Sequence, residues 1–239
     1  DKAASALLIG GVCWALYAFS GVDAHHMNEH LSHHLVDIAE ILFFLLGAMT
    51  IVELIDAHQG FAIITDKITT NKKVALMWIL CTITFFFSAA LDNLTTAIVM
   101  AALLPKLIKG KEDLWMFAGM VILSANAGGA WSPIGDVTTT MLWIDDKVTA
   151  AGLIEFVVLP SIVCFIIPFF VASYLKPFQG SINVDSTKDA TAERLLSSKT
   201  MLFLGLAMIV SVPVFKTITH LPPYVGMMLA LGVVWLVSE

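Results

Sequence analysis

Residues 114–144 read LWMFAGMVILSANAGGAWSPIGDVTTTMLWI, an apolar run that is interrupted in its middle. The interruption, residues 124–136, contains Gly128, Gly129 and Pro133. Glycine and proline both disfavour a continuous helix, so we expect this run to form two half-helices. Within a bilayer, unwound backbone is tolerated only where protein or a water-filled cavity covers it. The stretch therefore predicts a broken helix at a functional position.

The composition of the whole chain places this stretch in a membrane. The 239 residues are 58% hydrophobic and 13% charged, whereas soluble domains are about 45–50% apolar and about 25% charged. No strand-like alternation is visible, and lipid permits only helices or closed barrels, so the fold class is an all-α polytopic membrane protein. A spanning helix needs about 20 apolar residues. The apolar segments are 3–20, 36–57, 74–91, 94–108, 114–127, 137–144, 152–175, 201–219 and 224–238.

Several function classes are excluded by composition and motif. The chain has no dense basic block that would suit nucleic acid, and its three cysteines all lie in apolar runs, unlike a secreted disulfide framework. There is no phosphate-binding loop for ATP-driven transport and no serine–histidine pattern for hydrolysis. We therefore expect no enzyme activity and no cofactor. The chain begins at Asp1 rather than Met, and we expect a fragment of a longer protein.

A second interrupted run, residues 74–108, predicts a helical hairpin. Asp92-Asn-Leu-Thr-Thr96 divides it. If this run enters the membrane and returns, and 114–144 crosses once, every Lys and Arg except Lys147 and Lys216 falls on one side. Such a bias marks the cytoplasmic side. We therefore expect a re-entrant hairpin over 74–108 and a cytoplasmic loop over 176–200.

The two interruptions share one pattern, Asp-x-x-Thr-Thr, beginning at Asp92 and at Asp136. Each Asp precedes an apolar run that it can cap, and the hydroxyls three and four residues later lie on its own helix face. Carboxylates, hydroxyls, amides and unwound carbonyls are hard oxygen ligands that suit Na⁺, and transporters build ion sites at such breaks. The candidate ion-binding residues are Asp92, Asn93, Thr95, Thr96, Asn126, Ser132, Gly135, Asp136 and Thr139.

Plainer roles for these residues stay open at the level of sequence. Both aspartates could be interfacial helix caps, although a carboxylate deep in the membrane costs roughly 2.5–3.5 kcal/mol and is functional by default. The threonines could bond back to helix carbonyls. Gly128, Gly129 and Gly135 could shape the ion site, or they could only let another helix approach closely.

Two further groups of titratable residues stand apart from the breaks. Glu53 lies about one turn inside the 36–57 segment and is either a proton relay or a carboxylate at headgroup level. The segment His25–His34 holds five of the seven histidines. His26, His30 and His34 have helical i, i+4 spacing that could bind a transition metal or sense pH. The alternative is a hydrated loop on the non-cytoplasmic side.

The two interruptions resemble the NhaD-type sodium/proton antiporters. The resemblance is carried by Asp92-Asn-Leu-Thr-Thr-Ala97 and by Asn126-Ala-Gly-Gly-Ala-Trp-Ser-Pro-Ile-Gly-Asp-Val-Thr-Thr-Thr-Met-Leu-Trp143, and residues 39–66 are similar too. This family belongs to a superfamily with arsenite exporters and dicarboxylate/sodium symporters. The resemblance covers most of 30–175 and is weak in 176–239.

The resemblance implies an architecture. Family members have two inverted repeats, each with a re-entrant hairpin and a broken helix, sodium sites near the tips and an elevator-like moving unit. On that pattern, residues 1–175 are the first transport repeat, with its hairpin over 74–108 and its broken helix over 114–144. Residues 201–239 are then the start of the second repeat.

The function that the residues and the resemblance together predict is exchange of Na⁺, and also Li⁺, for H⁺. Burial raises the pKa of a carboxylate and a bound cation lowers it, so protons and Na⁺ would compete for one site. The first rival is an anion transporter of the same superfamily, for arsenite or a Na⁺-coupled dicarboxylate. The second is a membrane metal or pH sensor built on His25–His34. We expect a multi-pass protein of a bacterial inner membrane, or alternatively an organelle envelope, with a homodimer as the candidate assembly.

Overall fold

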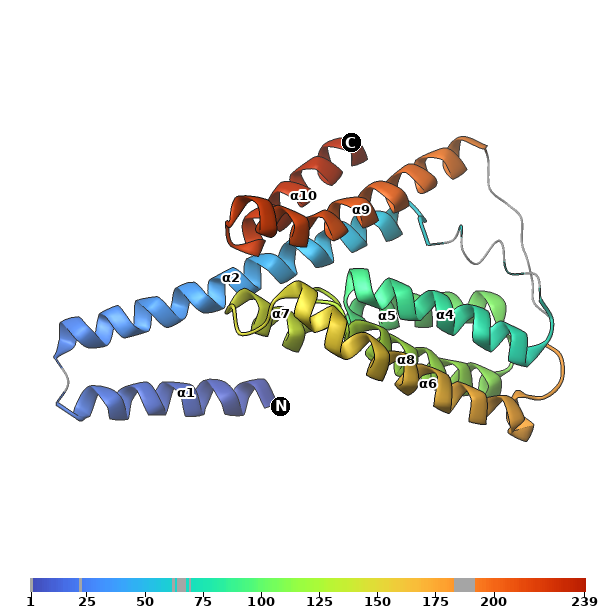
Figure 1. Ribbon diagram of the computed structural model, residues 1–239, viewed down its shortest axis with the longest axis horizontal. Coiled ribbons are helices and arrows are strands. Elements are labelled where there is room, and N and C mark those ends of the chain that lie inside the picture. Colours follow the sequence, from blue (N-terminus) through green and yellow to red (C-terminus); the bar gives the residue numbers. More distant parts are fainter. Residues whose placement is uncertain (1, 22, 62, 64–67, 69, 183–191) are drawn as a thin grey trace. The chain divides into compact units, whose positions relative to one another are not determined.

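The computed structural model describes the chain except residues 1, 22, 62, 64–67, 69 and 183–191; the side chains of 24, 106 and 192–196 are also left undescribed. The described residues form helices and one isolated bridge, between Lys72 and Ser181. The helices are α1 (Lys2–Phe19), α2 (Ala24–Ala57), α4 (Lys73–Leu91), α5 (Asn93–Leu107), α6 (Lys111–Gly129), α7 (Val137–Ile144), α8 (Ala150–Tyr174), η1 (Lys176–Phe178), α9 (Ala192–Thr219) and α10 (Pro223–Ser238) (Figure 1).

The helical, membrane-spanning character expected from sequence is confirmed. Five of the described helices, α1, α2, α4, α8 and α9, are long and apolar enough to cross a membrane. Most apolar side chains of α1 and α8 are exposed, as expected for surfaces that face lipid rather than water, whereas half of α4 is buried. The chain is therefore a multi-pass integral membrane protein.

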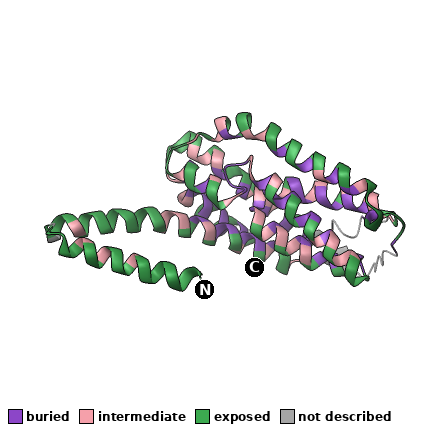
Figure 2. Ribbon diagram, turned by 90° about the horizontal axis from the view of Figure 1, so that it is seen from below, coloured by how far each residue is buried: buried purple, intermediate pink, exposed green. Residues whose placement is uncertain are grey.

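The chain divides into two compact units, Asp1–Leu42 and Phe43–Glu239. The first contains α1 and the early turns of α2, and α1 has no buried residue (Figure 2). The polar stretch 21–35, which we treated as a loop between apolar segments, is helical from Ala24 onward. Its backbone hydrogen bonds continue directly into the apolar part of α2, which explains the single helix of 34 residues.

The second unit is built around the helical hairpin. A single residue, Asp92, separates α4 from α5, and both helices pack against each other and against α6 (Figure 1). The helix α6 also packs against α8, while α9 packs against α10. The hairpin over 74–108 is therefore present as two helices with Asp92 between them.

The contact between α4 and α6 is unusually close because small residues line it. A Cβ atom on Gly128 would collide with the backbone carbonyl of Phe85, so only glycine fits there. Two hydroxyls join the helices as well: Ser124 Oγ donates to the carbonyl of Cys81, and Ser88 Oγ donates to that of Ala125, each at 2.5 Å. Close approach through small residues is a common device of membrane helices.

Polar contacts gather three segments of the second unit at one end of α4. Lys73 Nζ lies 2.5 Å from Asp113 Oδ1, and the amide of Ile182 donates to the carbonyl of Asn71 at 2.7 Å. This arrangement agrees with a membrane topology in which the start of α4, the start of α6 and the end of α8 lie on the same side of the membrane. The expected loop 176–200 is shorter than predicted, because α9 already begins at Ala192.

Lys216 makes a separate polar contact near the end of α9. Its Nζ lies 2.7 Å from Asp146 Oδ1 and 2.8 Å from the carbonyl of Trp143, at the end of α7. The same Nζ lies 4.9 Å from the centroid of the Trp143 ring. The two basic residues set apart by the sequence analysis, Lys147 and Lys216, therefore flank one polar cluster around Asp146.

Candidate functional site

Asp92 is both the joint of the hairpin and the cap of its second helix. Its carboxylate accepts hydrogen bonds from the amide and the hydroxyl of Thr95, at 2.8 and 2.7 Å. The backbone has φ 73° and ψ 156°, a region that is essentially restricted to glycine and costs on the order of 1–3 kcal/mol for other residues. The side chain is only 8% exposed. A strained, buried carboxylate at a helix break marks a position where an aspartate is kept despite its cost.

Asp136 has the same role at the second break. Its Oδ1 accepts a hydrogen bond from the amide of Thr138 at 2.8 Å and so caps α7. Thr139 Oγ1 donates to the carbonyls of Ser132 and Asp136, each at 2.9 Å, which ties the start of α7 to the unwound segment. The buried Ser132 hydroxyl accepts from the amide of Ile134 at 3.3 Å. The broken helix over 114–144 is therefore observed, with residues 130–136 outside the helices.

Asn93 brings the two breaks together. Its Nδ2 donates to Asp136 Oδ2 at 2.6 Å and to Asn126 Oδ1 at 3.0 Å. Because Asn93 follows Asp92 directly, this contact lies beside the hairpin joint that Asp92 caps. The cluster of Asn93, Asn126 and Asp136 combines residues that lie 33 and 43 positions apart in the chain.

The threonine hydroxyls near the two breaks differ in whether they have a hydrogen-bond partner. Those of Thr95 and Thr139 are already bonded, the first to Asp92 and the second to backbone carbonyls. Thr96 is 1% exposed, and its hydroxyl has no hydrogen-bond partner among the described residues. A buried hydroxyl without a partner carries a free-energy cost of about 1–3 kcal/mol, so its lone pairs are available to a ligand.

A groove of about 340 Å³ between α5 and α6 reaches this cluster. Its polar end is formed by Asn93 and Asn126 and its walls are apolar; the lining residues are Asn93, Leu94, Ala97, Ile98, Ala101, Ile122 and Asn126. Through this groove, the side-chain amides of Asn93 and Asn126 are accessible from the surface.

Gly135 lies at the site for a reason of packing. A Cβ on Gly135 would be 2.6 Å from the carbonyl oxygen of Gly129 and 2.8 Å from that of Ser88. Neither Gly128, Gly129 nor Gly135 has a positive φ. Gly128 thus lets another helix approach closely, whereas Gly129 and Gly135 let the second break fold tightly on itself and on Ser88. Their role in shaping an ion site stays a prediction.

Glu53 is not part of the cluster. Its side chain is exposed on α2, on the face opposite the buried Ile51 and Ile55. Among the described residues, no hydrogen bond joins Glu53 to Asp92 or Asp136. Its role as a proton relay stays a prediction.

Ser88 and Ser124 were missed by the sequence analysis, although they hold α4 against the broken helix. Ser88 lies inside the apolar run 74–91, and Ser124 is the first residue of the interruption 124–136, but neither was named as a candidate. A signal was available, because Ser124 and Gly128 are four residues apart and so form the small-residue spacing typical of close helix contacts.

Comparison with known proteins sets this arrangement in a family. Residues 2–236 match the citrate transporter family, CitMHS. The chain belongs to this family. Within it, the NhaD-type resemblance is borne out: the chain is 42% identical over its whole length to sodium/proton antiporter 1 of Arabidopsis thaliana and 40% identical to sodium/proton antiporter 2 of the same plant. It is also 32% identical over 97% of its length to the Na⁺/H⁺ antiporter NhaD of Vibrio cholerae.

The chain spans about half the length of these relatives: 42%, 57% and 49% of the three proteins respectively. The matched half includes both helix breaks of the described site. Activity of the longer proteins therefore transfers to this CitMHS member only as a proposal.

Proposed function

We propose that this chain contributes one half of a secondary transporter that exchanges Na⁺ for H⁺. The observation that carries the proposal is that Asn93, next to the capping Asp92 of one break, bonds to Asn126 and to the Asp136 carboxylate of the other break. Broken helices that offer carboxylate and carbonyl oxygens are how secondary transporters hold Na⁺. Three relatives that carry the word antiporter in their names support it.

The coupling follows from competition for the same oxygens. A carboxylate cannot hold a proton and coordinate Na⁺ through the same lone pair, so loading one ion displaces the other. Asp92 and Asp136 would be the titrating ligands. Asn126, Ser132 and the free hydroxyl of Thr96 would complete the coordination, whereas Thr95, Thr139 and Asn93 would hold the carboxylates in position.

An anion as the main substrate is the second candidate, because the family description names citrate. The capping geometry argues against it. The amides of Thr95 and Thr138, which would bind an anion at the half-helix N-termini, already bind Asp92 and Asp136. Neither break contains a Lys or Arg in the sequence. A carboxylate substrate would thus meet two carboxylates and no positive partner.

One experiment separates these candidates. Everted membrane vesicles carrying the protein are loaded with a pH-sensitive dye, a proton gradient is established, and NaCl, LiCl or KCl is added. Na⁺, and to a similar degree Li⁺, should release the gradient, whereas K⁺ should not. Citrate and arsenite uptake are measured in the same vesicles, and uptake of either without Na⁺-dependent proton flux would favour the anion transporter.

Two finer points belong to the same proposal. A bacterial inner membrane is the proposed location, with an organelle envelope as the alternative, and fractionation of membranes from the source cell is the measurement that tests it. A homodimer is the proposed assembly, and its mass in detergent is the measurement that tests it. Neither point alters the chemistry proposed for the two aspartates.

A further inference from the structure

The histidine segment has a defined geometry that the proposed exchange does not use. Since α2 begins at Ala24, the side chains of His26, His30 and His34 follow one another at one-turn spacing along one face of a helix. His26 is engaged with Glu29 at 3.8 Å, at the solvent-exposed start of the helix. His30 and His34 face α1 instead.

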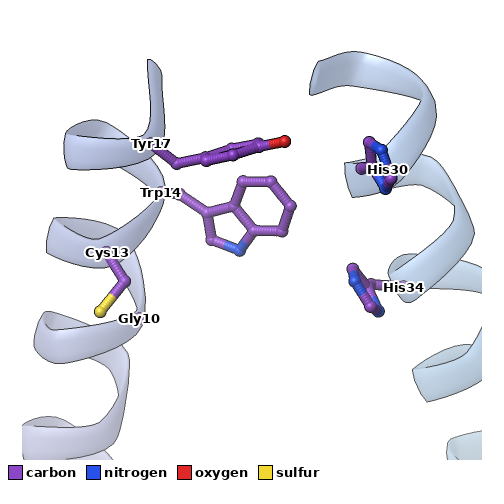
Figure 3. Close-up of a pocket in the computed structure, with 6 residues that line it drawn as sticks. All are labelled: Gly10, Cys13, Trp14, Tyr17, His30 and His34. Atoms are coloured by element: carbon purple, nitrogen blue, oxygen red, sulfur yellow. The ribbon is translucent and has the colours of Figure 1, made fainter. Parts of the chain in front are cut away.

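These two histidines line a cavity of the first unit. It has a volume of about 350 Å³ and is lined by Gly10, Cys13, Trp14, Tyr17, His30 and His34. In Figure 3 the Trp14 ring and the Tyr17 hydroxyl point across the cavity toward the two imidazoles, whereas the Cys13 sulfur points away from them. The Trp14 and His34 rings are 6.2 Å apart between centroids, in an edge-on arrangement.

Two imidazoles one helical turn apart are a chelating pair. The neutral ring nitrogen is a common ligand of Zn²⁺, Cu²⁺ and Ni²⁺, and paired histidines four residues apart on a helix face hold zinc in other proteins. Asp37 Oδ2 lies 3.9 Å from Nδ1 of His34. The same oxygen lies 3.3 Å from Nδ1 of His33, so this carboxylate adds negative charge beside His34 without a hydrogen bond to its ring.

We propose that His30 and His34 chelate a divalent transition-metal ion of the Zn²⁺, Ni²⁺ or Cu²⁺ class in this cavity. Among the described residues, no three His, Cys, Asp or Glu side chains are grouped to hold one ion. The remaining coordination positions therefore belong to water, which makes the site open and exchangeable rather than structural. Hard cations such as Na⁺ prefer oxygen ligands, so this site is distinct from the ion site proposed at Asp92 and Asp136.

The test is a calorimetric titration of the purified protein, in detergent, with ZnCl₂. The wild type should bind one Zn²⁺ per chain at this site. The double variant His30→Ala/His34→Ala should lose affinity by more than the roughly 10–100-fold that loss of an outer-shell partner costs. The matched control His25→Ala/His33→Ala removes as many histidines from the same helix but spares the pair, and it should bind as the wild type does. Helix content measured by circular dichroism shows that each variant is folded.

Trp14 reports where the metal binds. Cu²⁺ quenches nearby tryptophans, and Trp14 is the tryptophan beside His34. The saturable Cu²⁺ quenching of the wild type should disappear in Trp14→Phe. Equal loss of affinity in both double variants would indicate diffuse binding to exposed histidines and overturn the proposal. Saturable quenching that persists in Trp14→Phe would overturn it too, because the metal would then lie elsewhere. The outcome does not depend on the proposed exchange activity.

Discussion

Asn93, in the first turn of α5, donates a hydrogen bond of 2.6 Å from Nδ2 to Oδ2 of Asp136, which caps α7. This contact joins the hairpin tip to the broken helix. Hydrogen bonds to charged groups contribute about 1.5–3 kcal/mol, more than neutral ones. The Asn93–Asp136 bond is therefore both a structural link and a means of positioning the carboxylate.

Replacing Asn93 tests that link directly. In Asn93→Ala the Oδ2 atom of Asp136 loses its donor, and we expect apparent Na⁺ affinity to fall together with a loss of about 1–3 kcal/mol of stability. Asn93→Asp keeps the size but places a second negative charge beside Asp136, and it should lower exchange further. Exchange is measured against Na⁺ concentration and normalised to folded protein. An unchanged half-saturating concentration in both variants would show that the link does not position the site.

Substitution by asparagine separates the charge of the two aspartates from their capping role, because asparagine caps a helix about as well as aspartate does. Asp92→Asn and Asp136→Asn should therefore fold and insert normally but lose Na⁺-dependent proton flux. Asp→Glu at either position should give intermediate activity, since the charge moves by one methylene. Near-normal exchange in both Asn variants would leave the aspartates as caps only.

Asp92→Gly gives a second test at the hairpin joint. Glycine relieves the positive φ of 73° but removes the carboxylate and its bonds to Thr95. We expect thermal stability to change little, because the relieved strain of about 1–3 kcal/mol offsets the lost cap, typically about 1 kcal/mol. Exchange should nevertheless be abolished. A melting-temperature series in detergent, run beside the vesicle assay, separates the two effects.

The glycines of the second break are predicted to serve packing. Gly128→Ala places a Cβ against the carbonyl of Phe85 and should reduce yield and thermal stability strongly, and Gly135→Ala should do so as well. Gly119 lies on the same helix with open space around it, so Gly119→Ala is the matched control. That control should be neutral or stabilising by up to about 1 kcal/mol. If Gly135→Ala instead shifts Na⁺ affinity at normal yield, Gly135 shapes the ion site.

The threading of the chain is tested by labelling single cysteines from each side of the membrane. In a background without Cys13, Cys81 and Cys164, cysteines at Lys72 and Lys109 should react only from the cytoplasmic side, and one at Lys147 only from the other side. The expectation rests on the distribution of basic residues, and the Lys73–Asp113 ion pair holds the first two regions at one end of α4. Labelling of 72 and 109 from opposite sides would contradict the hairpin.

The sequence by itself determined where the helices lie and where they break. Apolar runs, glycines, prolines and capping aspartates act within one or two turns, and lipid forces every other backbone group into a helix. For this reason the break at Asp92 could be placed from the sequence. The second break was predicted over 124–136, but α6 stays helical through Gly129 and the break covers only 130–136. The helical form of the His25–His34 segment could not be predicted, because its polar composition suits a loop as well as a projecting helix.

Only the tertiary structure decided which residues meet. The sequence marks the helix face that a residue occupies but not its partner on another helix, so it could propose Asn93, Asn126 and Asp136 as ligands without showing that one amide bridges the other two. The contact of Gly128 with Phe85 and the hydroxyl bonds of Ser88 and Ser124 were hidden for the same reason. These contacts join positions 37 to 43 residues apart, and they exist because small side chains let two helix backbones approach closely enough to bond.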